Sequence, residues 1–358
     1  MNIGLIGAGN ISGTHARAIG EIPGATVAAI YGPTRERAAA LAAQHGAAAY
    51  DSLDQFLNHR PMEMVAIGSP SGLHGEHGIA AAKRGLHVLV EKPIEITTGR
   101  VDAFITETQR AGVTLGVIFQ DRMKPDIVRL KATVDAGALG QPILASARVK
   151  WYRPPEYYGG SKWRGTWALD GGGALMNQGV HTVDLLLWLG GPVRRVFARA
   201  AAKLHPIEVE DTAVAVLEFA SGAFGTLEAT TSAYPGYARR MELTGSKGTA
   251  ILDGDRLDLS GVRLGSDPGQ TTVRPQSDPG QTAVRPQSDP GQTPVNASSP
   301  VVADVSAHRR VFEDFIGAVT DRRPPLCDGE AARASVAVIE AIYRSSSLQV
   351  PVEIGGVV

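Results

Sequence analysis

Over the first 120 residues, short apolar runs alternate with longer alanine-rich runs that have helical periodicity. Strands that alternate with helices of this length are typical of a parallel, doubly wound sheet with right-handed crossovers. The pattern therefore predicts an α/β domain over residues 1–121. Its expected strands are 3–6, 26–31, 64–67, 87–90 and 114–119, and its expected helices are 14–19, 35–45, 74–84 and 99–111.

After residue 120, long runs with period-two alternation take over. Consecutive alternating strands joined by short turns predict a large, mostly antiparallel open sheet with one covered face. We expect a second, α+β domain over 122–358, whose C-terminal helices are free to pack back on the first domain. The open face predicts a homodimer or homotetramer. The expected strands are 143–152, 194–203, 211–219, 223–232, 239–245 and 249–252, and the expected helices are 126–136, 174–189, 306–320 and 329–346.

A tandem repeat with a period of eleven residues occupies 266–293, where Ser-Asp-Pro-Gly-Gln-Thr recurs. Asp-Pro-Gly favours turns, and the prolines disfavour central strands. So few copies of so short a unit predict a loop insertion at a sheet edge, with a binding role as the alternative.

Composition excludes several classes of partner. The 35 basic and 36 acidic residues give a net charge of −1, which offers no electrostatic argument for nucleic acid or an anionic membrane. No targeting segment and no apolar run of transmembrane length stands out. The single cysteine, Cys327, cannot form an internal disulfide. We therefore expect a cytoplasmic protein.

The chain begins with a strand, a glycine-rich turn and a helix, which is the context of a dinucleotide-binding fingerprint. Gly7 permits the tight turn, and Gly9 lets a pyrophosphate approach the backbone. The N–H groups that open the helix at Asn10 and Ile11 then face the anion. Ser12 replaces the third glycine. The first domain is thus expected to be a Rossmann domain.

Glu91-Lys92-Pro93 follows the fourth expected strand, at the sheet edge where ligands bind. A lysine beside a nicotinamide has a lowered pKa and transfers protons. The alternative is an exposed lysine in a strand-to-helix turn.

A second candidate segment spans 170–184, where three glycines lead into an expected helix. Asn177 and His181 are spaced i, i+4 and would share one helix face, so His181 could act as a general acid or base. The alternative is a buried, hydrogen-bonded histidine. No second His or Cys falls at ligand spacing, so we expect no metal.

The loop 151–167 is aromatic and basic. Aromatic faces stack on sugars, and arginine binds phosphate or carboxylate bidentately. Packing of the aromatic rings beneath a long loop is the alternative.

Together these segments resemble the Gfo/Idh/MocA oxidoreductases, the group of glucose–fructose oxidoreductase and inositol dehydrogenase. The resemblance covers essentially the whole chain except the repeat. The matching segments are Gly7-Ala-Gly-Asn-Ile, Ser69-Pro-Ser-Gly-Leu-His74, His87-Val-Leu-Val-Glu-Lys-Pro93, Gln120-Asp-Arg122, and Gly171-Gly-Gly with Gly179-Val-His181-Thr-Val-Asp184.

The resemblance implies a catalytic pair, Lys92 and His181, and a cis peptide bond before Pro93. Asn177, Tyr157, Arg122 and Asp170 are the expected substrate-binding residues. In the family, a Trp-Arg pair at Trp163 and Arg164 often touches the cofactor. The other residues expected at the cofactor are Ser69, Pro70, Leu73, His74, Glu91, Lys92, Pro93 and Gln120.

Two departures from the family pattern bear on chemistry. Gly32 stands where NAD-preferring members carry an acidic residue, while Thr34 and Arg35 suit a 2′-phosphate, so we favour NADP over NAD. Arg35 could also be only a solvated first-turn residue. Asn177 replaces an aspartate, so no charge at this position raises the pKa of His181. Residues 174–179 resemble a subgroup related to UDP-N-acetylglucosamine-uronate 3-dehydrogenases.

The sequence thus predicts an NAD(P)-dependent oxidoreductase that moves a hydride between the nicotinamide and a secondary hydroxyl of a sugar, cyclitol or sugar derivative. Two alternatives remain. One is a hydrolase or lyase that retains its NAD and oxidises the sugar transiently, and the other is a cofactor-sensing regulator without catalysis.

Overall fold

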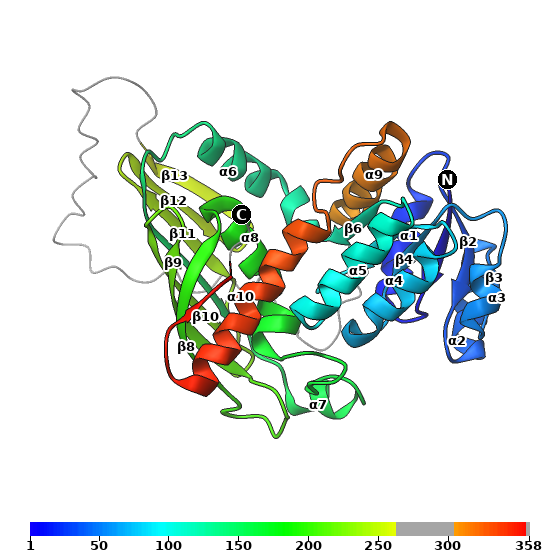
Figure 1. Cartoon of the computed structure of the whole chain (residues 1–358), viewed down its shortest axis with the longest axis horizontal. Coiled ribbons are helices and arrows are strands. Elements are labelled where there is room, and N and C mark those ends of the chain that lie inside the picture. The colour runs from blue at the N-terminus through cyan, green and yellow to red at the C-terminus, as the bar shows by residue number, and fades with distance from the viewer. Residues whose placement is uncertain (263–303, 356–358) are drawn as a thin grey trace, which may run out of the picture.

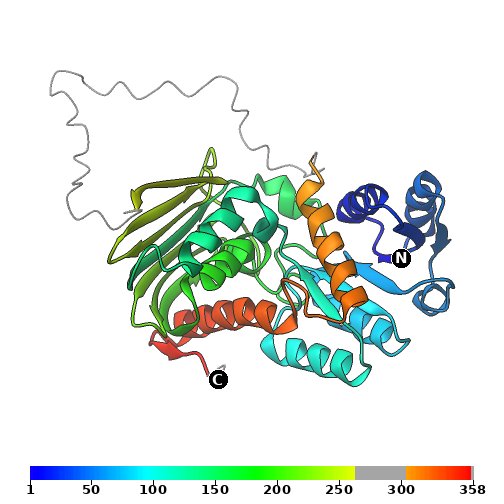
Figure 2. The same ribbon diagram turned by 90° about the horizontal axis from the view of Figure 1, so that it is seen from above.

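The computed structural model describes residues 1–262 and 304–355 (Figure 1). The repeat at 266–293 therefore lies outside the described residues. The described chain forms two sheets, with helix α10 (Gly329–Leu348) lying between the second sheet and helix α5 (Thr98–Arg110) of the first domain (Figures 1 and 2).

Six parallel strands form the first sheet in the order β3-β2-β1-β4-β5-β6. Alternate strand residues belong to two apolar clusters, one on each face: Val88 and Val90 pack with Phe104, and Leu89 packs with Phe315. Because both faces are covered, the strands are continuously apolar. The strands are β1 (Asn2–Ile6), β2 (Thr26–Tyr31), β3 (Ala48–Tyr50), β4 (Met64–Ile67), β5 (His87–Glu91) and β6 (Leu115–Ile118).

Helices connect these strands and cover the sheet. Thr97 caps α5 by accepting a hydrogen bond from the Arg100 N–H, and Ser52 caps α3 in the same way from Gln55. The helices and short 3₁₀ turns are α1 (Asn10–Gly20), α2 (Arg35–His45), α3 (Leu53–Leu57), η1 (Ser71–Leu73), α4 (His74–Ala82), α5 and η2 (Gln120–Met123).

The second sheet has eight strands in the order β13-β12-β11-β7-β10-β9-β8-β14. All neighbours pair antiparallel except β7 and β10, which are parallel. Small residues such as Ala145 and Ala147 line its inner face, where α8 packs closely. The strands are β7 (Pro142–Lys150), β8 (Val193–Ala201), β9 (Thr212–Phe219), β10 (Phe224–Thr230), β11 (Arg240–Gly245), β12 (Gly248–Asp253), β13 (Arg256–Val262) and β14 (Val352–Glu353).

The helices of this second part cover the inner face and then return to the first domain. Helix α9 lies against α1, and its Phe312 and Phe315 join the apolar core of the first sheet. The chain then crosses along α10 to β14. The helices are α6 (Pro125–Asp135), α7 (Pro155–Gly159), the π-helical turn η3 (Ala174–Gly179), α8 (Val180–Gly190), α9 (Ser306–Asp321) and α10.

The predicted fold class is confirmed, as are the principal strands and helices. The predicted continuous helix over 174–189 is wrong, because its first six residues form the π-helical turn η3. The elements β3, α3, α7, β13 and β14 were not predicted, because they are short or carry few apolar residues. No helix among the described residues is both long and apolar enough to cross a membrane.

Candidate active site

Segments predicted to bind the cofactor meet at one edge of the first sheet. The strands are parallel and paired, so their carboxyl ends lie together. The predicted cofactor residues at these ends are Gly7, Gly9, Asn10 and Ile11 after β1, Thr34 and Arg35 after β2, Ser69, Pro70, Leu73 and His74 after β4, Glu91, Lys92 and Pro93 at β5, and Gln120 after β6.

The glycine-rich turn fits a dinucleotide. Gly7 has φ +118°, and a Cβ there would lie 2.8 Å from the Gly68 carbonyl oxygen. At Gly9, the residue that precedes α1, an added Cβ would meet no atom within 4 Å. The backbone at the start of the helix is therefore open to a phosphate. Ser12 is 1% exposed and packs against Gly7 and Gly68, so this position needs a small side chain.

Glu91 is buried and contacts a histidine of helix α1. Its Oε1 lies 2.9 Å from His15 Nε2, and both side chains are buried. Burial raises the pKa of Glu91, but the hydrogen bond and nearby cationic charges outweigh it and lower the pKa to about 2. Glu91 is thus a fixed anion that anchors the end of β5, where the Lys92–Pro93 bond is cis as expected.

His74 was expected to line the cofactor, and its side chain is buried behind the turn that follows β4. The side chain is 1% exposed, with Nδ1 2.8 Å from the Pro93 carbonyl and Nε2 2.9 Å from the Ser69 carbonyl. Burial lowers its pKa, so the ring is neutral and donates to one of these carbonyls. The His74 ring therefore packs between the turn after β4 and the turn after β5. Ser69, Pro70 and Leu73 remain partly exposed.

Lys92 joins the two domains. Its Nζ donates a hydrogen bond of 2.9 Å to the carbonyl oxygen of Asn177, in the π-helical turn η3. Burial lowers the pKa of Lys92, while the charges of Glu91, Asp170 and Asp121 oppose that shift. The ammonium group therefore sits in the candidate site between acidic neighbours.

His181 lies in the first turn of α8, with its ring edge-on to Phe119 at 5.7 Å between centroids. Burial lowers its pKa to about 3, although Asp121 acts in the opposite direction. Among the described residues its Nδ1 has no hydrogen-bond partner. A neutral imidazole carries one lone-pair nitrogen, so His181 is able to accept a hydrogen bond from a hydroxyl at neutral pH, and its low pKa makes the ring a weak base.

Asn177 and His181 do not share a regular helix face, because Asn177 lies in η3 rather than in α8. Such π-helical turns often occur at functional sites. Asn177 Nδ2 donates to Asp170 Oδ1, and its Oδ1 accepts from Gln178 Nε2 at 2.7 Å. Asp170 was expected to bind substrate, but it is 1% exposed and also accepts from the Gly165 N–H. It therefore contacts Asn177 and leaves no oxygen without a partner.

Two arginines flank Tyr157 in the loop after β7. The guanidinium carbons of Arg153 and Arg164 lie 5.1 and 4.3 Å from the ring centroid of Tyr157. Trp163 stacks with Arg164 at 5.5 Å. In residues 1–262 and 304–355, neither arginine forms an ion pair with a carboxylate. The loop thus concentrates positive charge that no carboxylate of the described residues contacts in an ion pair.

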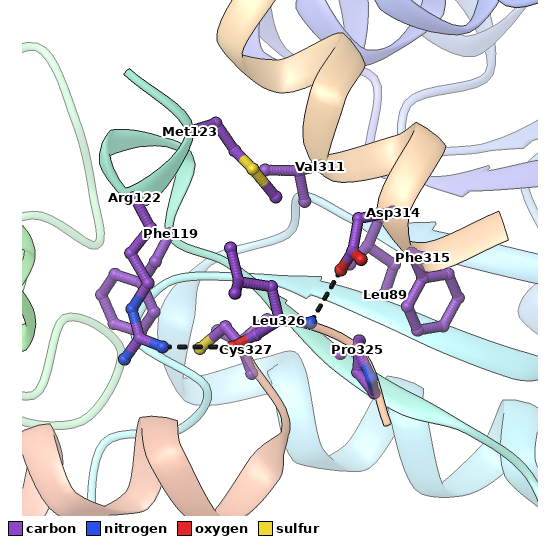
Figure 3. Close-up of a pocket in the computed structure, with 12 residues that line it drawn as sticks. Leu89, Phe119, Arg122, Met123, Val311, Asp314, Phe315, Pro325, Leu326 and Cys327 are labelled. Carbon is purple, nitrogen blue, oxygen red and sulfur yellow. Dashed lines mark hydrogen bonds between the residues drawn. The ribbon is translucent and has the colours of Figure 1, made fainter. Parts of the chain in front are cut away.

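Arg122 was expected to bind substrate, and the structure assigns it to the core instead. Its Nε and Nη2 donate to Asp184 at 2.8 and 2.6 Å, and the two side chains are 4% and 1% exposed. Its Nη1 donates to the Leu326 carbonyl, beside a cavity of about 10 Å³ next to Cys327 (Figure 3). A cavity of that size holds at most a single water molecule.

Arg35 lies at the start of α2 and is highly exposed. Its Nη1 forms an ion pair of 3.2 Å with Asp51, which follows β3. Thr34 precedes the helix without a side-chain capping bond. The two predicted phosphate ligands therefore follow the carboxyl end of β2, and Asp51 competes for the Arg35 guanidinium.

A Rossmann sheet with an open glycine turn, together with a lysine and a neutral histidine, defines an NAD-binding oxidoreductase. Residues 1–119 match the model described as "Oxidoreductase family, NAD-binding Rossmann fold", and residues 127–251 match the GFO/IDH/MocA C-terminal domain. The chain belongs to the Gfo/Idh/MocA family.

Relatives support this assignment. The chain is 30% identical to the oxidoreductase YrbE of Bacillus subtilis, over 71% of this chain and 74% of that protein. It is 30% identical to myo-inositol 2-dehydrogenase of Thermotoga maritima, over 72% and 76%. The WlbA dehydrogenase of Bordetella pertussis, solved in complex with NADH and UDP-GlcNAcA, superimposes with a TM-score of 0.84 at 29% identity, over 99% of each chain. The protein is therefore an NAD-binding oxidoreductase related to sugar and cyclitol dehydrogenases.

Sequence reasoning missed several residues that shape this site: Arg153, Gln178 and His15. Arg153 lay within the loop flagged as aromatic and basic, which was the available signal. His15 and Gln178 act through partners that only the fold brings close, so no local pattern marks them.

Proposed function

We propose that this protein oxidises a secondary hydroxyl of a sugar that carries an acidic group, with Lys92 and His181 handling the hydroxyl proton. The observation that carries the proposal is the hydrogen bond from Lys92 Nζ to the Asn177 carbonyl, which holds the end of β5 against η3 beside a neutral His181. When bound, NAD(P) supplies the hydride acceptor. Lys92 stabilises the oxygen that loses its proton, and His181 accepts that proton on its lone-pair nitrogen.

The acidic group of the proposed substrate is inferred from the positive charge of two arginines in the loop after β7. Arg153 and Arg164 lie on one aromatic ring without an anionic partner in the described chain, and like charges held together favour an anion between or beside them. The complex of WlbA with UDP-GlcNAcA supports an acidic substrate for this chain as well.

Among nucleotides we propose a modest preference for NADP. Gly32 offers no carboxylate to the ribose, and Arg35 is exposed at the edge where that ribose is expected. The carboxylate of Asp51 beside Arg35 limits the preference, because it repels a phosphate that approaches the same guanidinium.

The test is a spectrophotometric assay with matched pairs of sugars, glucose with glucuronate and UDP-N-acetylglucosamine with its uronate, each offered NAD⁺ and NADP⁺. We expect reduction of the nucleotide with an acidic member and at least tenfold lower kcat/KM with its neutral counterpart. We also expect the larger kcat/KM with NADP⁺. Equal rates on neutral and acidic sugars would contradict the acidic subsite. If no sugar leads to reduction of the nucleotide, and the protein retains its nucleotide, the result would favour a hydrolase or a sensor.

We further propose that the outer face of the second sheet binds a second copy of this chain. Phe197, Val214, Val216 and Phe224 lie exposed on that face, and Phe224 is 59% exposed. Val216 pairs with Phe197 across the β8–β9 ladder, and Phe224 pairs with Leu144 across β10–β7, so the apolar side chains adjoin. Contiguous apolar surface of this kind marks an interaction site.

Replacing both Val216 and Phe224 by glutamate is expected to convert an oligomer into a 37.6 kDa monomer, measured by light scattering after size exclusion. The matched control is Val128→Glu on α6, which is similarly exposed but lies away from this face. A wild-type protein that runs as a monomer would overturn the proposal.

A further inference from the structure

A chain of hydrogen bonds crosses the candidate site with a donor-only group at one end and an acceptor-only group at the other. Arg153 Nη2 donates to Gln178 Oε1 at 2.6 Å. Gln178 Nε2 then donates to Asn177 Oδ1 and to Tyr157 Oη, both at 2.7 Å. Asn177 Nδ2 donates to a carboxylate oxygen of Asp170. Each amide therefore has its nitrogen and oxygen assigned by its neighbours.

The groups at the two ends, Arg153 and Asp170, prevent the hydrogen bonds between them from reversing direction. A guanidinium can only donate, and an ionised carboxylate can only accept. If the Asn177 amide turned over, its oxygen would face the Asp170 carboxylate and its nitrogen would face Gln178 Nε2. Neither contact is a hydrogen bond, and leaving such buried groups unpaired is costly.

We propose that Asp170 and Arg153 are positioning residues that set the direction of this chain, so that Asn177 presents an acceptor oxygen and Tyr157 presents its O–H to the substrate. Both hydrogens of Gln178 Nε2 are used, so the Tyr157 oxygen accepts and its own hydrogen is left to donate. Burial raises the pKa of Tyr157, which keeps that hydrogen in place at neutral pH. Asn177 and Tyr157 both remain partly exposed.

The consequence for specificity rests on the proposed function. The site binds a substrate hydroxyl at Asn177 Oδ1, on the residue whose backbone carbonyl accepts from Lys92, and an acceptor such as a carboxylate or carbonyl oxygen at Tyr157. The arginines that flank Tyr157 favour the carboxylate. Asp170 does not contact the substrate and acts only through Asn177.

The ionisation state of Asp170 controls how firmly the direction of these hydrogen bonds is set. Burial raises its pKa to about 7, while hydrogen bonds from Gly165 and Asn177 and the charges of Lys92 and Arg164 lower it. A protonated Asp170 carries no charge and accepts a weaker hydrogen bond from Asn177 Nδ2, so the Asn177 amide is held less firmly. The titratable and charged groups that face Asp170 are Lys92 at the end of β5, Tyr157, Tyr158 and Arg164 in the loop after β7, and Tyr343 on α10.

The experiment exchanges the carboxylate at position 170 and the amide at position 177. Asp170→Asn should lower kcat/KM about 100-fold, the usual effect of a misdirected active-site group. Asn177→Asp should also lower it, because two carboxylates then face each other. In the double variant, the amide placed at position 170 would donate to the carboxylate placed at position 177, so only this bond reverses its direction. The bonds from Gly165 to position 170 and from Gln178 to position 177 keep theirs, and position 177 still presents an acceptor oxygen. We expect the double variant to recover to within about tenfold of wild type.

Two further readouts separate positioning from simple structural support. Wild-type kcat/KM should fall below about pH 7, and that fall should disappear in Asp170→Asn. Glu210→Gln is the matched control, since Glu210 is also a buried carboxylate and accepts from the N–H groups of Gly173 and Leu175. It should lower the Tm and keep the fall below pH 7.

A double-mutant cycle measured by thermal unfolding needs no substrate. It therefore tests the coupling between positions 170 and 177 even if the proposed function is wrong. At pH 8 the double variant should have a higher Tm than either single variant. The proposal is overturned if Asp170→Asn retains wild-type kcat/KM and pH dependence, or if the double variant is no better than the worse single variant in Tm. A wild-type protein inactive on every sugar counts against the proposed function alone.

Discussion

Lys92→Met is expected to lower kcat about 10³-fold, within the range that positioned proton-transfer groups contribute. The ammonium is the cation that the end of β5 places against η3. Methionine matches the lysine side chain out to Cε and removes the charge and the hydrogen bond to Asn177. Steady-state kinetics with the best substrate of the panel, together with nucleotide fluorescence for binding, measures the effect.

The matched control is Lys83→Met, an exposed lysine just beyond α4 whose loss should leave kcat unchanged. A folded Lys92→Met variant with kcat within tenfold of wild type would falsify the assigned role. Because the pKa of His181 is about 3, that ring is already neutral at pH 5. A fall in activity near pH 7 is therefore not assigned to His181.

Asp184→Ala should destabilise the protein by about 3–5 kcal/mol, the usual cost of removing one member of a buried ion pair. Arg122 would be left charged in the core, where it would still contact the Leu326 carbonyl and the face of Trp188 at 5.1 Å. Neither contact replaces a carboxylate that accepts two hydrogen bonds. Urea unfolding, followed by tryptophan fluorescence, gives the change in free energy.

The pair itself stabilises the fold little. Burial raises the pKa of Asp184 to about 6 in spite of the Arg122 charge and hydrogen bonds. A carboxyl pKa raised on folding contributes stability below the unfolded value of about 4, and that contribution is lost as pH rises through 6. Replacing both Arg122 and Asp184 by leucine should therefore recover most of the lost stability. The control, Glu107→Ala beside Arg110 on the solvent-facing side of α5, should change the stability far less than Asp184→Ala. A double variant less stable than Asp184→Ala would contradict this account.

Local patterns were sufficient for much of the first domain. The strand at 26–31 and the helix at 35–45 were predicted with the bounds that the structure shows, because continuous apolar runs and alanine-rich helices have distinct periods. The turn at Gly7 and Gly9 was recognised because a strand and a helix flank it. By contrast β3 and α3 have three and five residues, too few to show a period.

The candidate site was only partly predictable, because its geometry depends on contacts distant in the sequence. Lys92 and His181 were named from their segments, but the bond from Lys92 to Asn177 spans 85 residues. Arg122 was assigned to substrate because its partner, Asp184, lies 62 residues away and only the fold shows that both are buried. The π-helical turn η3 was missed because its residues have an ordinary helical composition.

The route of the C-terminal segment limits how this protein can be recombined. Helix α9 supplies Phe312 and Phe315 to the core of the first domain, α10 lies against both domains, and β14 then completes the second sheet. A chimera with a breakpoint near residue 121 would take those aromatic side chains from one parent and the strands beneath them from the other. Exchange of substrate specificity between relatives is thus feasible only for cassettes that end before α9, such as residues 122–262.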